Sequence, residues 1–171
     1  MWVVWGPALT TRFLKSDPRQ MSLGAEALRR YKALMAHFSR AFSLSTQDKH
    51  QIVDITRKVT DVLRESGVSE GQLTVFTPHA TAAIAINEND DPNIGTDLLH
   101  ALSKLIIEHD GWLHDRIDNN AAAHIKSAIM GPSEIVPIIG GRLSLGTWQN
   151  FFFCEFDGPR RERQVIVSIV S

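Results

Sequence analysis

Residues 72–92, QLTVFTPHATAAIAINENDDP, contain the pattern that decides the fold. Two runs rich in apolar and β-branched residues, 72–77 and 81–88, are separated by a proline-containing turn, and each has the length of a strand. The stretch ends in Asp91 followed by Pro92, residues that favour a helix N-cap and a first helical turn. It therefore predicts two strands followed by a helix.

Short strands and an amphipathic helix precede this stretch. FSLST at 42–46 and QIVDIT at 51–56 alternate like the two strands of a hairpin. RKVTDVLRES at 57–66 has one apolar helical face and is followed by Gly67, a typical C-terminal helix cap. The first half of the domain is therefore predicted to mix both kinds of element.

The second half of the chain continues this mixture. The helix that begins at Asp91 is predicted to run to about Glu108, with a buried stripe that includes Leu102 and Leu105. A second helix, AAAHIKSAIM, follows Asn120, which can cap it. Four strands then close the chain: EIVPII, RLSLGTW, NFFFCEF and RQVIVSIV. Strands and helices that are mixed but segregated predict an α+β fold with largely antiparallel pairing.

The first 40 residues differ from the rest of the chain. They include apolar residues at three- and four-residue spacing, among them Leu28, Tyr31 and Leu34, which predict one helical stripe over 24–41. We expect an N-terminal extension at 1–40. A peripheral extension without chemistry and a partner-binding helix both remain open, and so does the question of whether this segment is translated.

Composition limits the class of protein. The 171 residues with 43% apolar content fit one domain with a substantial core. A formal net charge of -1 gives no positive field that would attract nucleic acid. The single cysteine, Cys154, excludes an internal disulfide framework and favours a reducing compartment. No apolar run approaches the roughly 20 residues that span a bilayer, and no secretion signal is evident. We therefore expect a soluble, cytoplasmic protein that binds neither nucleic acid nor membrane.

Polar residues gather at both ends of the predicted strand 81–88. His79 precedes the strand, and Asn87, Glu88 and Asn89 stand at its far end. Asparagines at such a place are ordinary turn formers, but Glu88, at the tip of an apolar strand, has no capping role that explains it. Glu88 is therefore a candidate general base or ligand.

The densest polar stretch runs from His109 to His124 and holds three histidines, three aspartates and two asparagines. This composition on a long connection is typical of a metal or phosphate site. The spacing of His114 and His124 matches no single-helix zinc motif, so a site that joined them to His79 would be assembled by the fold. A hydrogen-bonded structural histidine is the alternative at each position. Lys126, beside His124, is a candidate phosphate contact.

A third cluster follows the glycine pair at 140–141. Arg142 adds a guanidinium suited to phosphate. Trp148 and Gln149 combine a flat stacking surface with a two-ended amide, which suits a planar heterocycle, and a core tryptophan is the alternative reading of Trp148. Neither a phosphate loop nor a dinucleotide fingerprint is present.

Four blocks of the sequence together resemble the YjbQ-like, or secondary thiamine-phosphate synthase, family: FSLST…IVDIT, TPHATAAIAINENDDP, WLHDRIDNNAAAHIKSAIMGPS and GRLSLGTWQNFFFCEFDGPRRER. The resemblance covers about residues 42–171. It implies an α+β fold in which two largely antiparallel sheets pack as a sandwich with a few helices, in a YjbQ-like domain at 41–171 that assembles as a homotrimer. It also implies that histidines near a subunit boundary, at His79, His114 and His124, bind a metal or an anion.

The resemblance implies an activity as well, the joining of a pyrimidine pyrophosphate to a thiazole phosphate with loss of pyrophosphate. On this hypothesis His79, His114 and His124 hold a divalent metal, zinc or magnesium, while Glu88 and His79 act in catalysis. The small phosphorylated substrate is expected to contact Asn87, Asn89, Lys126, Arg142, Trp148 and Gln149. Two alternatives remain open: a non-catalytic trimeric ligand-binding or scaffold protein, and a metal-dependent phosphate hydrolase.

Overall fold

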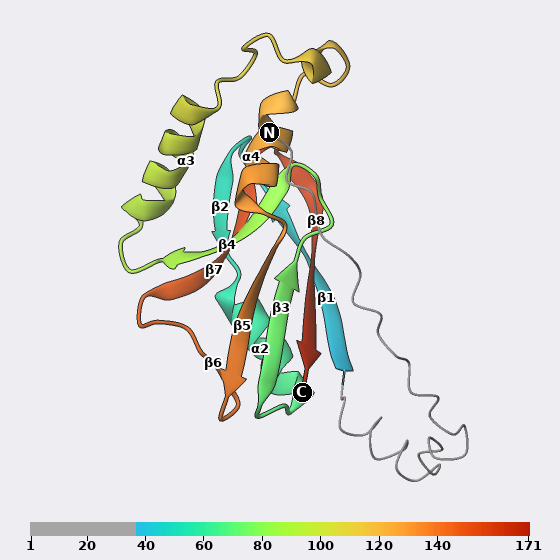
Figure 1. Ribbon diagram of the computed structural model, residues 1–171, viewed down its shortest axis with the longest axis vertical. Coiled ribbons are helices and arrows are strands. Elements are labelled where there is room, and N and C mark those ends of the chain that lie inside the picture. The colour runs from blue at the N-terminus through green and yellow to red at the C-terminus, as the bar shows by residue number, and fades with distance from the viewer. Residues whose placement is uncertain (1–36) are drawn as a thin grey trace, which may run out of the picture. The chain divides into compact units, whose positions relative to one another are not determined.

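The computed structural model describes residues 37–171, which form two antiparallel sheets with helices (Figure 1). The large sheet has five strands in the order β1-β8-β3-β5-β6, and the small sheet has three in the order β2-β7-β4. Neighbouring strands in both sheets are antiparallel. The predicted α+β fold with two antiparallel sheets and a few helices is therefore confirmed.

The elements have the following bounds. The strands of the large sheet are β1 (His37–Thr46), β3 (Gly71–Phe76), β5 (Ser133–Ile139), β6 (Arg142–Leu143) and β8 (Arg160–Val170). The strands of the small sheet are β2 (Gln51–Asp54), β4 (Ala82–Glu88) and β7 (Gln149–Glu155). The helices are α2 (Thr56–Ser66), α3 (Asn93–Leu105), the short 3-10 turn η1 (Leu113–Arg116) and α4 (Ala121–Met130).

Consecutive strands do not pair at the start of the domain, so the predicted hairpin of 42–46 with 51–56 is wrong. β1 pairs with β8 in the large sheet, whereas β2 pairs with β7 in the small sheet. The alternation in each segment correctly indicates a strand, but it does not identify the partner strand. The partners lie about a hundred residues further along the chain, as the pairing of Ile52 with Cys154 shows.

Three other boundaries differ from the expectation. Residues 37–41 lie in β1, so the predicted helix over 24–41 is wrong there, and the rest of that prediction lies outside the described residues. Helix α3 ends at Leu105, which is 72% exposed instead of buried. The predicted strand RLSLGTW is reduced to the two residues of β6, and the loop that follows contains a turn in which the Gly146 N–H bonds to the Gln149 side chain at 2.8 Å.

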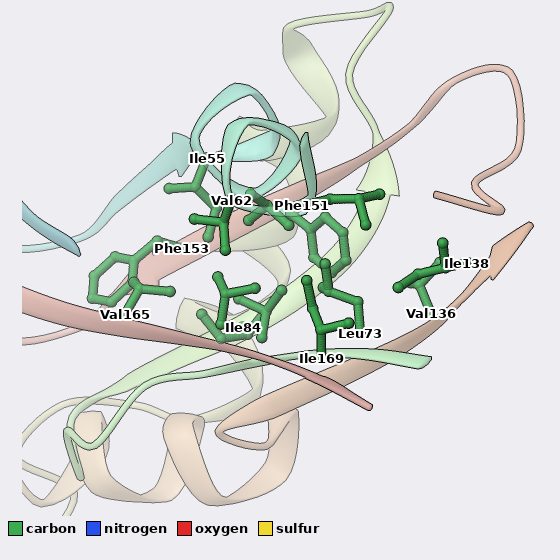
Figure 2. Close-up of a cluster of buried hydrophobic side chains, with 14 of the residues drawn as sticks. Ile55, Val62, Leu73, Ile84, Val136, Ile138, Phe151, Phe153, Val165 and Ile169 are labelled. Carbon is green, nitrogen blue, oxygen red and sulfur yellow. The ribbon is translucent and has the colours of Figure 1, made fainter. Parts of the chain in front are cut away.

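The main core lies between the large sheet, the small sheet and α2 (Figure 2). Residues 151–155 of β7 are all buried, because the small sheet is covered on both faces. Phe151 and Phe153 belong to the main core, while Phe152 and Cys154 pack on the other face in a second cluster with residues of α3 and α4. A strand covered on both faces reads as a continuous apolar run, which explains the sequence NFFFCEF.

The outward face of the large sheet leaves apolar side chains in solvent. Phe76 on β3 and Ile135 and Ile139 on β5 are 37%, 59% and 60% exposed. β3 and β5 are paired neighbours, with Ser133 opposite Phe76 and Thr74 opposite Ile135. We call the outward surface that carries Phe76, Ile135 and Ile139 the outer apolar face. Exposed apolar side chains on one sheet face make it a candidate interaction surface.

The helices of the described part are short. Between residues 37 and 171, no helix is both long enough and apolar enough to cross a membrane.

Candidate functional site

His79 lies just beyond β3, in a connection that continues the contact of β3 with β8. The strand ladder ends where Phe76 pairs with Ile166. Beyond it, Thr77 Oγ1 donates a hydrogen bond to the Gln164 carbonyl at 3.1 Å, and the Gln164 N–H donates to His79 Nε2 at 2.8 Å. Both backbone polar groups of Gln164 are thus used by this connection, which fixes the imidazole from its Nε2 side.

The surroundings of His79 favour its neutral form. Burial lowers the pKa of His79, and the nearby Arg163 guanidinium lowers it further, while the Glu155 carboxylate opposes them more weakly. A neutral ring agrees with the hydrogen bond, because Nε2 must carry a lone pair in order to accept the Gln164 N–H.

A buried ion pair anchors β8 beside His79. The side chain of Glu155 is fully buried and that of Arg163 is 7% exposed. Arg163 Nε donates to Glu155 Oε2 at 2.6 Å, and Arg163 Nη2 also donates to Thr81 Oγ1 at 3.0 Å. Thr46 Oγ1 donates to the same carboxylate at 3.1 Å. The two opposite charges compensate each other, and their polar atoms have hydrogen-bond partners. We call Arg163 and Glu155 the anchor pair.

A hollow of about 670 Å³ opens beside His79. Helix α4 supplies one side of it, and Ser127 Oγ of that helix donates to the Ala82 carbonyl at 2.7 Å, which ties α4 to β4. We call this space the His79 hollow. Its lining residues are Phe76, Thr77, Pro78, His79, Ala80, His124, Ser127, Ala128 and Pro132. The hollow therefore combines two imidazoles with largely apolar walls.

The rings of His114 and His124 lie against each other. Their ring centroids lie 4.8 Å apart, with the ring planes at 83°. His114 Nε2 is 3.9 Å from Asp118 Oδ2, too far for a hydrogen bond, and this buried nitrogen has no hydrogen-bond partner among residues 37–171. His124 thus connects His114 with the His79 hollow.

The three histidines do not form a metal centre within one chain. Across residues 37–171, no group of three or more His, Cys, Asp or Glu side chains is arranged to hold a metal ion. His79 Nε2 is occupied by the Gln164 N–H, and a metal needs a nitrogen lone pair directed at it. The zinc or magnesium implied by the resemblance therefore does not fit these residues as one chain holds them.

Lys126 lies on the opposite side of α4 from His124, since two residues turn a helix by about 200°. Its side chain is 2% exposed, and Nζ lies 3.9 Å from Glu108 Oε1 and 3.5 Å from His50 Nε2. Glu108 also contacts Lys49 at 2.6 Å and His50 at 2.9 Å. Lys126 therefore belongs to a second group, the Lys126 cluster of Lys49, His50, Glu108 and Lys126, and not to the His79 hollow.

The pKa values within the Lys126 cluster are displaced by burial and by charge. Burial lowers the pKa of Lys126, an effect that Glu108 opposes. Burial and the Lys126 ammonium lower the pKa of His50. Burial alone would raise the pKa of Glu108, but the hydrogen bond and charge of Lys49, with the charges of His50 and Lys126, bring it below its usual value.

The acidic and amide residues at the far end of β4 are separated from His79. The strand from Ala82 to Glu88 spans roughly 20 Å. At that end Asn87 Oδ1 accepts the Glu88 N–H at 2.8 Å, and Asn89 Nδ2 donates to Asp54 Oδ2 at 2.7 Å. Asn87 thus bonds locally, whereas the Asn89 side chain bonds across to Asp54 of β2. One chain does not bring Glu88 to His79.

Trp148 and Gln149 join this far end. Gln149 pairs with Glu88 in the small sheet, and the Asn89 N–H donates to the Trp148 carbonyl at 3.0 Å. Trp148 is 60% exposed, so it is not a core residue. Arg142 lines a different hollow, of about 480 Å³, between α2 and the β6 region. The predicted substrate contacts are therefore distributed over separate places in one chain.

Sequence reasoning missed several residues that the structure makes prominent. His50 and Glu108 are partners of Lys126, yet the sequence gives no sign that the two residues meet there. The anchor pair did leave a signal, because Glu155 interrupts the apolar run of β7 and Arg163 occupies an inward position of β8. A charged residue at an inward position indicates a buried partner of opposite charge.

Residues 40–171 match the family described as "UPF0047 protein YjbQ-like". The chain belongs to this YjbQ-like family. A UPF0047 protein of Methanocaldococcus jannaschii is 41% identical over 130 residues, which cover 76% of this chain and 92% of that protein. The UPF0047 protein YugU of Bacillus subtilis is 42% identical over 124 residues, or 71% of this chain and 91% of the relative.

Solved structures of YjbQ-like proteins share the fold. A protein of Sulfolobus solfataricus, described as YbjQ-like and of unknown function, superposes with a TM-score of 0.78 at 35% identity, covering 80% of this chain and 99% of that one. An uncharacterised family protein of Clostridium acetobutylicum gives a TM-score of 0.73 at 45% identity, over 76% of this chain and 98% of that one. The predicted family is thus confirmed.

Proposed function

We propose that this YjbQ-like protein binds a small phosphorylated molecule in the His79 hollow and acts in the cytoplasm as a thiamine-phosphate synthase. The single observation that supports this best is the hollow itself, in which His79 and His124 face one space of about 670 Å³. That volume falls within the range of roughly 300–1,000 Å³ that is typical of small-molecule sites.

The walls of the hollow suit the proposed reactants. Phe76, Pro78 and Pro132 offer apolar surface to a flat heterocycle, and the two imidazoles offer polar contacts to phosphate. In the reaction, the bond between the methylene carbon attached to the pyrimidine ring and the pyrophosphate oxygen breaks. The thiazole nitrogen forms a bond to that methylene carbon. Pyrophosphate leaves with the electron pair. Hydrogen-bond donors placed at the departing oxygen would stabilise its growing charge.

Product formation by the purified protein tests this proposal. Aminopyrimidine pyrophosphate and thiazole phosphate are incubated with the protein, and thiamine phosphate is measured by chromatography. We expect product with the native chain, and a loss of about 10²-fold or more with His79→Ala and with His124→Ala, the range typical of a lost acid–base or polar catalytic group. His100→Ala, at an exposed position of α3, is the matched control and should keep full activity.

Two results would count against the proposal. Absence of product with the native chain would contradict the synthase activity. Full activity of both the His79→Ala and His124→Ala variants would show that the His79 hollow is not the site. Binding of the pyrimidine pyrophosphate without turnover would favour the ligand-binding alternative.

The proposal includes assembly as a homotrimer through the outer apolar face. Phe76 belongs both to this face and to the lining of the His79 hollow, so subunits that met there would also border the site. Sedimentation analysis should find a trimer for the native chain and a smaller species for the double variant Ile135→Lys with Ile139→Lys. Gln47→Lys adds charge at an exposed turn and should leave the trimer intact. A monomeric native chain would contradict this part of the proposal.

A further inference from the structure

The way in which His79 is held determines what its ring can offer a ligand. Nε2 accepts the Gln164 N–H at 2.8 Å. In a neutral imidazole the other nitrogen, Nδ1, then carries the proton. No hydrogen bond within residues 37–171 occupies Nδ1. The nitrogen that remains for a ligand is therefore a donor.

Thr77 also holds Gln164 in place, the residue whose N–H bonds to His79. Its side chain donates to the Gln164 carbonyl at 3.1 Å, and its own N–H donates to the Pro132 carbonyl at 2.9 Å. Thr77 is only 1% exposed, so water does not compete for this hydroxyl. We call Thr77, His79 and Gln164 together the Thr77 clamp.

The anchor pair holds the β8 side of the clamp. Gln164 directly follows Arg163, whose guanidinium binds Glu155 and Thr81. A shift of β8 at Gln164 would therefore disturb a buried ion pair, and such a disturbance is costly because it leaves a charge without its partner. The β8 side of the clamp is thus held by a buried ion pair.

We propose that Thr77 is a positioning residue that keeps His79 in its Nδ1–H form, so that His79 serves the hollow as a hydrogen-bond donor to an anionic oxygen instead of as a metal ligand. Only the identity of the ligand, a phosphorylated molecule, rests on the proposed function. The tautomer follows from the geometry of the chain itself.

Nuclear magnetic resonance of the ¹⁵N-labelled full chain tests the tautomer. Long-range ¹H–¹⁵N correlations distinguish a protonated Nδ1 from a protonated Nε2, and His79→Ala identifies the signals of this ring. We expect Nδ1–H in the native protein. Inorganic pyrophosphate should shift the His79 ring signals, whereas Zn²⁺ at the same concentration should leave them unchanged. A protonated Nε2, an unresponsive ring with pyrophosphate, or a selective effect of Zn²⁺ on His79 would overturn the proposal.

Variants of Thr77 test its positioning role. Thr77→Val removes the hydroxyl at nearly constant shape, so we expect a mixture of both His79 tautomers and a loss of about tenfold in pyrophosphate affinity, the size of one hydrogen bond. Thr77→Ser keeps the hydroxyl and should restore both properties. A Thr77→Val protein with native tautomer and affinity would overturn the role of Thr77. Thr77→Ala gives the same comparison where the valine variant does not fold.

The tautomer and pyrophosphate measurements on His79 are independent of the synthase assay. An Nδ1–H ring that responds to pyrophosphate, in a protein that forms no thiamine phosphate, would sustain the inference and remove the proposed activity. Product formation by a protein whose His79 is protonated at Nε2 would support the synthase activity and overturn the inference about His79.

Discussion

Two groups of buried charge lie beside the small sheet, and they are built differently. In the anchor pair, both side chains are almost fully buried and the guanidinium and carboxylate are in direct contact. In the Lys126 cluster, Lys126 is equally buried, but its carboxylate partner Glu108 is 30% exposed and 3.9 Å away. The first group is satisfied and acts as a structural support. The second leaves an ammonium poorly paired, and the lowered pKa of Lys126 reflects this.

The largest effect is expected from breaking the anchor pair. Glu155→Gln leaves Arg163 buried without a countercharge, which typically costs about 3–5 kcal/mol of unfolding free energy. Urea denaturation followed by circular dichroism measures the change. A loss below about 1 kcal/mol would show that Arg163 finds another partner and that the pair does not support the fold.

A smaller effect is expected from the Lys126 cluster. Glu108→Gln should lower the unfolding free energy by about 1–2 kcal/mol, because Lys126, His50 and Lys49 all lose their carboxylate partner. The loss is smaller than for Glu155→Gln because the Glu108 carboxylate is partly in water. Lys126→Met replaces the buried ammonium by an apolar chain and should reduce the cost of Glu108→Gln when the two are combined. Strictly additive effects would contradict a direct coupling of Lys126 with Glu108.

Two histidines, His50 of the Lys126 cluster and His79 beside the anchor pair, should make the stability depend on pH. The pKa values of His50 and His79 are lowered from 6.5 in the fold, so the unfolded chain binds protons more readily than the folded one. Stability is therefore fully present above pH 6.5 and declines as the pH falls below it. Between pH 7.5 and 5.5 we expect the unfolding free energy to fall, with a shallower decline in His50→Asn. An equal decline in that variant would exclude His50 as a source.

The smallest effect is expected at an exposed ion pair. Arg40 and Glu65 are in contact at 2.6 Å, but their side chains are 52% and 51% exposed. Glu65→Gln should change the unfolding free energy by no more than about 0.5 kcal/mol, since exposed pairs are screened by water and salt. A loss of unfolding free energy as large as that of Glu155→Gln would contradict the expectation that buried ion pairs contribute more to stability than exposed ones.

Much of the fold could be predicted because it depends on local pattern. Gly67 ends α2 at a φ of +67°, as its place after an apolar helical face predicts. The apolar run of β7 and the alternation of β8 gave both strands correctly. The pairing of β1 with β2 failed, because both have a suitable alternation and only distant strands determine which sheet each one joins.

The candidate site was predictable only in part. The sequence predicts a site that joins three histidines through the fold; in the structure His114 contacts His124, and His124 shares a hollow with His79. The Lys126 cluster was not predictable, because Lys126 and His50 are 76 positions apart. Glu88 is a candidate because it stands at the tip of an apolar strand without a capping role, but the length of a strand separates it from His79.

The sheet order has a consequence for how the chain folds. β7 and β8 occupy interior positions in their sheets, between β2 and β4 and between β1 and β3. During synthesis the earlier strands therefore leave the ribosome before the partners that join them. Neither sheet can close until these late strands emerge, so contacts of long sequence separation should dominate the folding barrier. Until β7 and β8 emerge, the earlier apolar strands lack their sheet partners, and unpaired strand edges of this kind are prone to aggregate.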